Sequence, residues 1–197
     1  MNEKLKPVEV DGKKEISEIM DRCHEIFKDT IAKKDRPMLG DREIYVPLKW
    51  IENKAELFWH SASIEEKAKL DIKPCNNDLT SALCEENCIT SKDTITMSNG
   101  DVRSKCIYRA TRINLIKSVI ELYNAGDARV KYWEKINSNK RNRLYLRYQE
   151  EELDYIIVFD EKSSKRVQLI TAYPVFFVSA KRDYEKDYQN YIKQKNR

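Results

Sequence analysis

Residues 142–175 constrain the fold most, because three strand-like segments follow one another there with only short, charged links between them. The segments are RLYLRY (143–148), YIIVF (155–159) and VQLITAYPV (167–175). Links this short favour antiparallel hairpins, since a parallel crossover needs a dozen or more residues. A further strand-like segment, VKYWEK (130–135), extends the predicted sheet to four strands.

A helix is expected just before this sheet, over residues 111–124. Its apolar positions recur at the spacing of one helical face, and Gly126 lies just past its end. A second helix is expected over residues 184–193. A helix followed by hairpin-linked strands predicts an α+β fold with a four-stranded antiparallel sheet and a packed helix.

The chain is interpreted as two parts, an N-terminal accessory part (1–105) and a sheet-bearing part with a C-terminal helix (106–197). Pro47 puts its own strand at a sheet edge, because proline cannot donate to the ladder. Within the first part, the patterns predict a helix (13–31), a strand pair with a turn near Asn53 (42–60), a short helix (63–70) and an irregular region (75–101).

Basic residues are unevenly distributed. The formal net charge is only +4, so overall electrostatics does not by itself indicate a nucleic-acid-binding protein. Between Arg129 and Arg147, however, there are seven basic residues and one acid, Glu134. This run is either a solvated surface or a patch that faces phosphate. The candidates for RNA contacts are Arg112, Lys140, Arg141, Arg143 and Tyr145.

Localisation is inferred from what the sequence lacks. Residues 1–10 have no apolar core of a signal peptide, and no run of 18 apolar residues occurs. Five cysteines without a secretion signal are typical of a reducing compartment. We therefore expect a cytoplasmic protein that does not cross a membrane.

Arg147 is the most informative residue of the predicted sheet. Strand residues alternate between faces, so Arg143, Tyr145 and Arg147 share one face of their strand. The neighbouring strand 155–159 is apolar throughout, which leaves Arg147 partly desolvated unless it lines a groove. It is either a phosphate ligand or an ion-pair partner of the acidic run 150–152.

His60 and Arg109 are the other candidates for RNA chemistry. Cleavage without a metal needs a group that takes the proton of the 2′-hydroxyl and cations that stabilise the phosphorane-like state. His60 is preferred over His24 as acid or base because it precedes an expected helix start; the alternative is a packed, hydrogen-bonded histidine. Arg109 and Arg112 oppose the dipole of the helix they precede, which favours an anion nearby, either an acidic side chain or a phosphate.

The cysteines offer a competing interpretation of His60. Cys75, Cys84 and Cys88 have the spacing C-x8-C-x3-C, and with His60 they would make a Cys3His zinc site. Such a site would hold a long polar region in place. The alternative is three ordinary reduced cysteines and no cofactor. The zinc and catalytic roles of His60 exclude each other.

The segments TRINLIKSVIELYN, NRLYLRYQ, DYIIVF and VQLITAYPV resemble the barnase–EndoU–colicin–RelE group of nuclease domains found in phage and mobile-element proteins, over residues 106–180. The resemblance implies a toxin-like or phage-associated, metal-independent ribonuclease, with Arg147, Thr171 and Tyr173 at the matching positions. The alternative is a non-catalytic relative that binds RNA or a host protein, and a protein inhibitor is a further candidate partner. The helix before the sheet offers only Lys117 as a base, which leaves acid–base chemistry to His60.

Overall fold

The main sheet of the protein has five strands. The computed structural model describes residues 5–10, 15–33, 37–47, 49–65, 93–151 and 153–196. The strand order is β1-β10-β9-β8-β7, and every neighbouring pair is antiparallel except β1 with β10. The strands are β1 (Glu43–Tyr45), β7 (Val130–Ile136), β8 (Asn142–Glu150), β9 (Leu153–Ser163) and β10 (Arg166–Pro174).

The four antiparallel strands confirm the sequence prediction, and β1 corrects the predicted strand number. β1 runs parallel to β10, with Ile44 opposite Val167. Local hairpin signals cannot reveal such a strand, because it comes from a distant part of the chain. β1 lies at the edge of the sheet, as the proline signal predicted, although Pro47 itself follows the strand.

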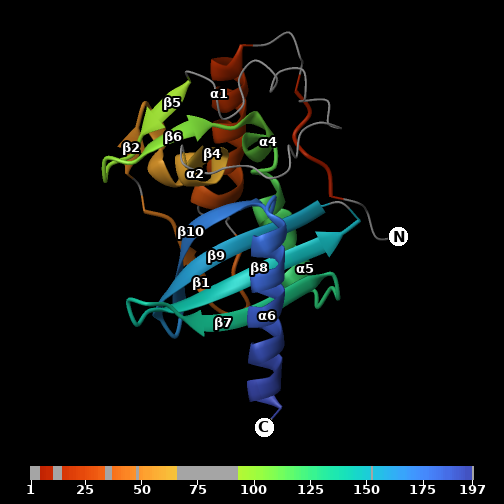
Figure 1. The fold of residues 1–197 in the computed structure, drawn as a ribbon. Coiled ribbons are helices and arrows are strands. Elements are labelled where there is room, and N and C mark those ends of the chain that lie inside the picture. Colours follow the sequence, from red (N-terminus) through yellow and green to blue (C-terminus); the bar gives the residue numbers. More distant parts are fainter. Residues whose placement is uncertain are drawn as a thin grey trace.

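The two faces of the sheet are covered by different helices (Figure 1). Helix α5 (Leu115–Asn124) packs on the face that carries Leu144 and Leu146 of β8. Helix α6 (Val178–Lys195) lies over the opposite face, where Tyr145 projects from the same strand. The packing of a helix on the sheet is therefore confirmed. The predicted helix 111–124 begins later, at Leu115, because residues 111–114 form turns after the short helix α4 (Ile107–Ala110).

Helix α6 is longer than the predicted 184–193 segment and is held to the sheet by aromatic rings. Trp133 and Tyr145 stack with ring centroids 5.0 Å apart, and the rings of Tyr184 and Tyr188 each lie 6.1 Å from Trp133. Lys131 of β7 adds an ion pair to Glu185 at 2.7 Å. Rings rather than aliphatic side chains make this contact, which explains why the apolar pattern of the helix is weak in the sequence.

The N-terminal helix is confirmed as α1 (Ile16–Phe27), which continues into a π-helical segment, η1 (Lys28–Ala32). One hydrophobic core contains Ile19 and Phe27 of this segment together with Val119 of α5 and Leu144 of β8. The first and second halves of the chain thus share both a core and a sheet.

The strand pair expected over residues 42–60 is only partly present. Strands β2 (Trp50–Ile51) and β3 (Lys54–Ala55) form a hairpin whose turn residues, Glu52 and Asn53, have φ angles of 46° and 61°. Residues 56–60, expected as strand, belong to helix α2 (Glu56–Ala62) instead. The apolar run in this segment is buried on several sides, and periodicity alone cannot separate such a helix from a buried strand.

A small second sheet replaces two other expectations, in the order β4-β6-β5. Ser63–Glu65 is strand β4 and not the start of a helix, because the Ser63 hydroxyl donates to the Trp59 carbonyl at 2.5 Å rather than capping a new helix. Part of the region expected to be irregular is strand β5 (Thr94–Thr96), which pairs with β6 (Val102–Lys105). Residues 66–92, including the rest of the predicted helix 63–70 and Cys75, Cys84 and Cys88, lie outside the described residues.

In the part of the chain that the structure describes, no helix is both long enough and apolar enough to cross a bilayer.

Candidate anion-binding site

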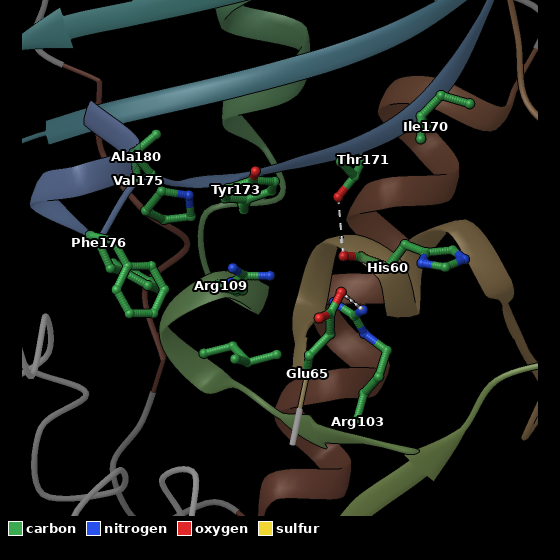
Figure 2. A pocket seen from close by; sticks show the side chains of 13 residues that line it. His60, Glu65, Arg103, Arg109, Ile170, Thr171, Tyr173, Val175, Phe176 and Ala180 are labelled. Atoms are coloured by element: carbon green, nitrogen blue, oxygen red, sulfur yellow. Dashed lines mark hydrogen bonds and ion pairs between the residues drawn. The ribbon is translucent and has the colours of Figure 1, made fainter. Parts of the chain in front are cut away.

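A cavity of about 330 Å³ lies where the end of β10 meets α2, α4 and the small sheet (Figure 2). It collects four of the five residues that the sequence nominated for catalysis, His60, Arg109, Thr171 and Tyr173. It also contains Arg103, which sequence analysis missed. The walls around these polar groups are largely apolar and include Ile64, Ile170, Val175, Phe176 and Phe177.

Arg109 is the central cation of the cavity. Helix α4 places it against the small sheet, where its Nη1 donates to the carbonyl of Ser63 at 2.7 Å. The guanidinium carbon lies 4.5 Å from the ring centre of Tyr173 and 5.6 Å from that of Phe176. Arg109 is only 9% exposed, and its buried Nε has no hydrogen-bond acceptor among the described residues. The two rings hold the plane of the guanidinium while leaving a donor unused.

The charge of Arg109 is not balanced by any carboxylate of the described residues, since its contacts are a carbonyl and two aromatic rings. Burial lowers the pKa of Arg109 from its ordinary value, because the charged form loses its hydration. Arginine nevertheless stays protonated at neutral pH. The cavity therefore contains a desolvated positive charge that an anion would neutralise.

Arg103 of β6 adds a second guanidinium on the same carbonyl. Its Nη2 donates to the Ser63 carbonyl at 3.0 Å, and its Nε donates to the Ser63 hydroxyl at 2.8 Å. The carboxylate of Glu65 lies 3.4 Å from its Nη1, but that side chain is 72% exposed. An ion pair at this distance with a solvated partner is weak. Ser63 thus brings Arg103 and Arg109 together on one side of the cavity.

Thr171 and His60 join the main sheet to helix α2. The Thr171 hydroxyl donates to the carbonyl oxygen of His60 at 3.1 Å, and the Ala172 amide donates to the Ser61 hydroxyl at 3.2 Å. A shift in the β10–β9 register between Leu169 and Thr171 marks the same point. Figure 2 shows that the imidazole of His60 is directed away from Arg109, whereas its carbonyl faces Thr171.

The protonation state of His60 follows from its surroundings. Burial lowers the pKa of the imidazole from its ordinary 6.5, and the positive charge of Arg103 lowers it further. His60 is therefore neutral at pH 7 and able to accept a proton. The helix start predicted at Ser63 is wrong, because the chain continues from α2 directly into strand β4 over the described residues 63–65.

Tyr173 connects the cavity to helix α6. One face of its ring stacks against Arg109, and its hydroxyl lies 2.7 Å from the hydroxyl of Tyr184. This hydroxyl is already engaged, so Tyr173 presents its ring to the cavity.

Arg147 does not line the cavity. Its Nε and Nη2 donate to the two carboxylate oxygens of Asp154 at 2.8 and 2.6 Å, and Glu185 of α6 lies 3.4 Å from its Nη1. Arg147 is 2% exposed, because α6 covers its face of the sheet. The structure places it in a buried ion pair whose partners are Asp154 and Glu185 rather than the acidic run 150–152.

The basic residues of the β7–β8 hairpin also lie outside the cavity. Arg143 pairs with Asp160 at 3.1 Å, and Arg141 lies 3.7 Å from the same carboxylate with its side chain 62% exposed. Lys140 occupies the turn with a φ angle of 58°. This part of the predicted RNA surface is therefore a hairpin tip whose two arginines share one acid.

The remaining two RNA candidates have intramolecular contacts. The guanidinium of Arg112 lies 3.4 Å from the ring centre of Tyr108, and its Nη1 donates to the Tyr108 carbonyl at 3.0 Å. Tyr145 stacks on Trp133 beneath α6. Neither lines the cavity.

The zinc hypothesis involves three cysteines outside the described residues. Within the ranges that the structure does describe, no group of three or more His, Cys, Asp or Glu side chains is arranged to hold a metal ion. The described cysteines, Cys23 and Cys106, lie in buried positions.

Comparisons of the chain with protein-family models, with curated proteins and with solved structures gave no match. The resemblance to the nuclease group thus stays a prediction.

Proposed function

We propose that the protein binds RNA and holds a backbone phosphate at Arg109 and Arg103. One observation carries this proposal. Arg109 is buried in a cavity without a carboxylate partner among the described residues, and its Nε lacks an acceptor. A buried charge without a counterion is costly for the fold, so a ligand that supplies the missing charge is the simplest reason for it.

The chemistry of the site favours phosphate over other anions. A guanidinium has a fork of donors that matches two phosphate oxygens, and here two guanidinium groups lie on one carbonyl. The cavity volume is near the lower end of the range for small-ligand sites. Its apolar and aromatic wall, including Phe177, suits the base of the same nucleotide. The resemblance of residues 106–180 to RNA-cleaving domains points to the same ligand.

Metal-independent RNA cleavage is the second candidate, and the observation that favours it is the neutral imidazole of His60 beside the cavity. In such a reaction His60 would take the proton of the 2′-hydroxyl, while Arg103 and Arg109 stabilise the charge on the phosphorane-like state. The imidazole would have to turn towards the arginines, because it is directed away from Arg109 (Figure 2). Binding requires no such rearrangement and is therefore the primary proposal.

The binding proposal is tested by fluorescence anisotropy with a labelled single-stranded 2′-O-methyl RNA, which blocks cleavage. Arg109→Met should weaken binding on the order of 10- to 100-fold, the equivalent of one or two charge-assisted hydrogen bonds. Its melting temperature should stay within a few degrees of wild type, because the substitution also removes a buried charge. Arg166→Met is the control, since that arginine is exposed and pairs with Glu43 outside the cavity. Unchanged RNA affinity in Arg109→Met would refute the proposal.

Cleavage is tested separately, by incubating total transfer RNA with the protein in EDTA. Wild-type cleavage that disappears in His60→Gln, while the affinity for 2′-O-methyl RNA is retained, would support His60 as acid or base. Binding without any cleavage would leave a non-catalytic RNA-binding protein. Binding to a host protein, with no affinity for RNA, would contradict both candidates.

A further inference from the structure

A second cavity, of about 230 Å³, lies next to the anion-binding cavity. His60 and Ile170 line both, so the two cavities meet along the seam between α2 and β10. The second cavity is also lined by Pro47, Lys49, Glu56 and Gln168. The two neighbouring cavities are together called the groove.

The second cavity carries donors that the protein itself does not use. Within the described ranges, the exposed Lys49 makes no direct ion pair, and its charge contributes, after the hydrogen bonds from Ser98, to lowering the pKa of Glu56 in the same cavity. The side-chain amide of Gln168 makes no hydrogen bond within those ranges. Glu56, the acid in this cavity, is already occupied, because it accepts from the Ser98 amide at 3.0 Å and from the Ser98 hydroxyl at 2.6 Å. A positive group and an amide are therefore left to face a ligand.

His60 lies at the junction of the two cavities. Its carbonyl is held by Thr171 on the side of the arginines, and its imidazole is directed away from them (Figure 2). A chain that leaves the arginines along this seam would pass Ile170 and the imidazole before it reaches Lys49. The groups thus follow one another in the order cation, imidazole, cation. This order matches the alternation of phosphate and nucleoside along a nucleic-acid strand.

Resting on the proposed RNA binding, we infer that the ligand is a single strand of at least two nucleotides that follows this groove. One phosphate binds Arg103 and Arg109, the adjoining nucleotide crosses Ile170 beside His60, and the next phosphate reaches Lys49. The amide of Gln168 is the donor and acceptor for a base edge in the second cavity. Cavities of this size admit single unstacked nucleotides and exclude a duplex.

The test compares two ligands by calorimetry, the 5′-phosphorylated 2′-O-methyl mononucleotide and tetranucleotide of uridine. The tetranucleotide should bind at least about tenfold more tightly, because stacking and a second phosphate add to the affinity. Lys49→Gln and Gln168→Ala should each reduce this ratio to about threefold or less and leave the affinity for the mononucleotide unchanged. Lys140→Gln, the same charge change at the β7–β8 turn, is the control and should leave the ratio as in wild type.

The outcomes separate the groove from the phosphate site. If neither ligand binds, the proposed function fails and the groove with it. If the mononucleotide binds but the tetranucleotide binds no better, the phosphate site stands and the groove is refuted. If the difference in affinity between tetranucleotide and mononucleotide is lost in Lys140→Gln but kept in Lys49→Gln, the strand binds over the β7–β8 hairpin instead. Equal affinity for a blunt duplex of the same sequence would overturn the single-strand assignment.

Discussion

The guanidinium of Arg109 lies over the ring of Tyr173, with its carbon 4.5 Å from the ring centre, while the Tyr173 hydroxyl lies 2.7 Å from that of Tyr184. Tyr173 thus contacts Arg109, the proposed phosphate-binding residue, through its ring. It contacts the covering helix α6 through its hydroxyl. The two contacts can be removed independently.

Tyr173→Phe and Tyr173→Leu should separate these contacts. The phenylalanine variant keeps the ring, so RNA affinity should stay within about twofold of wild type, and the lost hydrogen bond should lower the free energy of unfolding by about 1 kcal/mol. The leucine variant loses the stack on Arg109 and should bind RNA on the order of fivefold more weakly. Anisotropy and urea denaturation measure the two effects. Equal RNA affinity in both variants would show that the ring does not position the guanidinium.

Arg147→Ala should destabilise the fold by about 3–5 kcal/mol, because it leaves Asp154 buried without its bidentate partner. The double variant Arg147→Met with Asp154→Leu removes both charges and should recover most of that loss. Urea denaturation of the two variants measures the difference. RNA affinity of the folded double variant should equal that of wild type, and a selective loss of binding there would return Arg147 to the site.

Stability should fall as the pH is lowered from about 6.5 towards 4, in part through His24. Burial, followed by the charges of Lys28 and Lys54, lowers the pKa of His24 from 6.5 to about 4, and its neutral Nε2 accepts from the Ala55 amide at 3.1 Å. Between these pH values His24 binds a proton in the unfolded state but not in the folded state, so protonation favours unfolding. Urea midpoints between pH 7.5 and 4 measure the slope.

His24→Gln is the control for this pH effect, because the glutamine side chain does not titrate between pH 7.5 and 4. The slope should be smaller than in wild type, with a remainder from His60, whose pKa is lowered in the same direction. An unchanged slope in His24→Gln would show that other groups carry the pH dependence.

Lys140→Gly should stabilise the protein by about 0.5–1 kcal/mol. Lys140 has a φ angle of 58°, a conformation that glycine adopts without the steric cost of a Cβ atom. Thermal denaturation measures the gain, and RNA affinity should not change. A drop in melting temperature would show that the lysine side chain has a stabilising contact.

The sequence predicted the antiparallel strands and α5 because their signals are local. The alternation of side chains along the strands, the short turns between them and the apolar stripe of α5 can each be recognised within a short segment of the sequence. Helix α2 and strands β1 and β4 depend instead on partners far along the chain, such as Arg166 opposite Glu43 and Lys105 opposite Ser63. No local pattern distinguishes those segments from their alternatives.

The site was predictable to a similar degree. His60, Arg109, Thr171 and Tyr173 were nominated as residue types suited to phosphate chemistry, and the structure gathers them. Arg103 was missed because residues 102–105, just after the expected irregular region 75–101, were assigned to no element, although VRSK after the turn SNGD was a usable strand signal. Arg147 was assigned to phosphate because the position of Glu185 above it depends on how α6 docks.

The parallel pairing of β1 with β10 also sets an order for folding. It joins residues 123 apart in the chain, as between Glu43 and Arg166, whereas the other strands of that sheet meet through tight turns. Loop closure over that distance costs more entropy and is slower than forming hairpins. The meander of β7 to β10 is therefore expected to assemble first, and α2 and Ser63 to reach it only when the long loop closes. Until then Arg103, Arg109 and the Ser63 carbonyl lack the wall that Thr171 and Tyr173 of β10 supply. The complete anion-binding cavity is therefore acquired last and marks a completely folded chain.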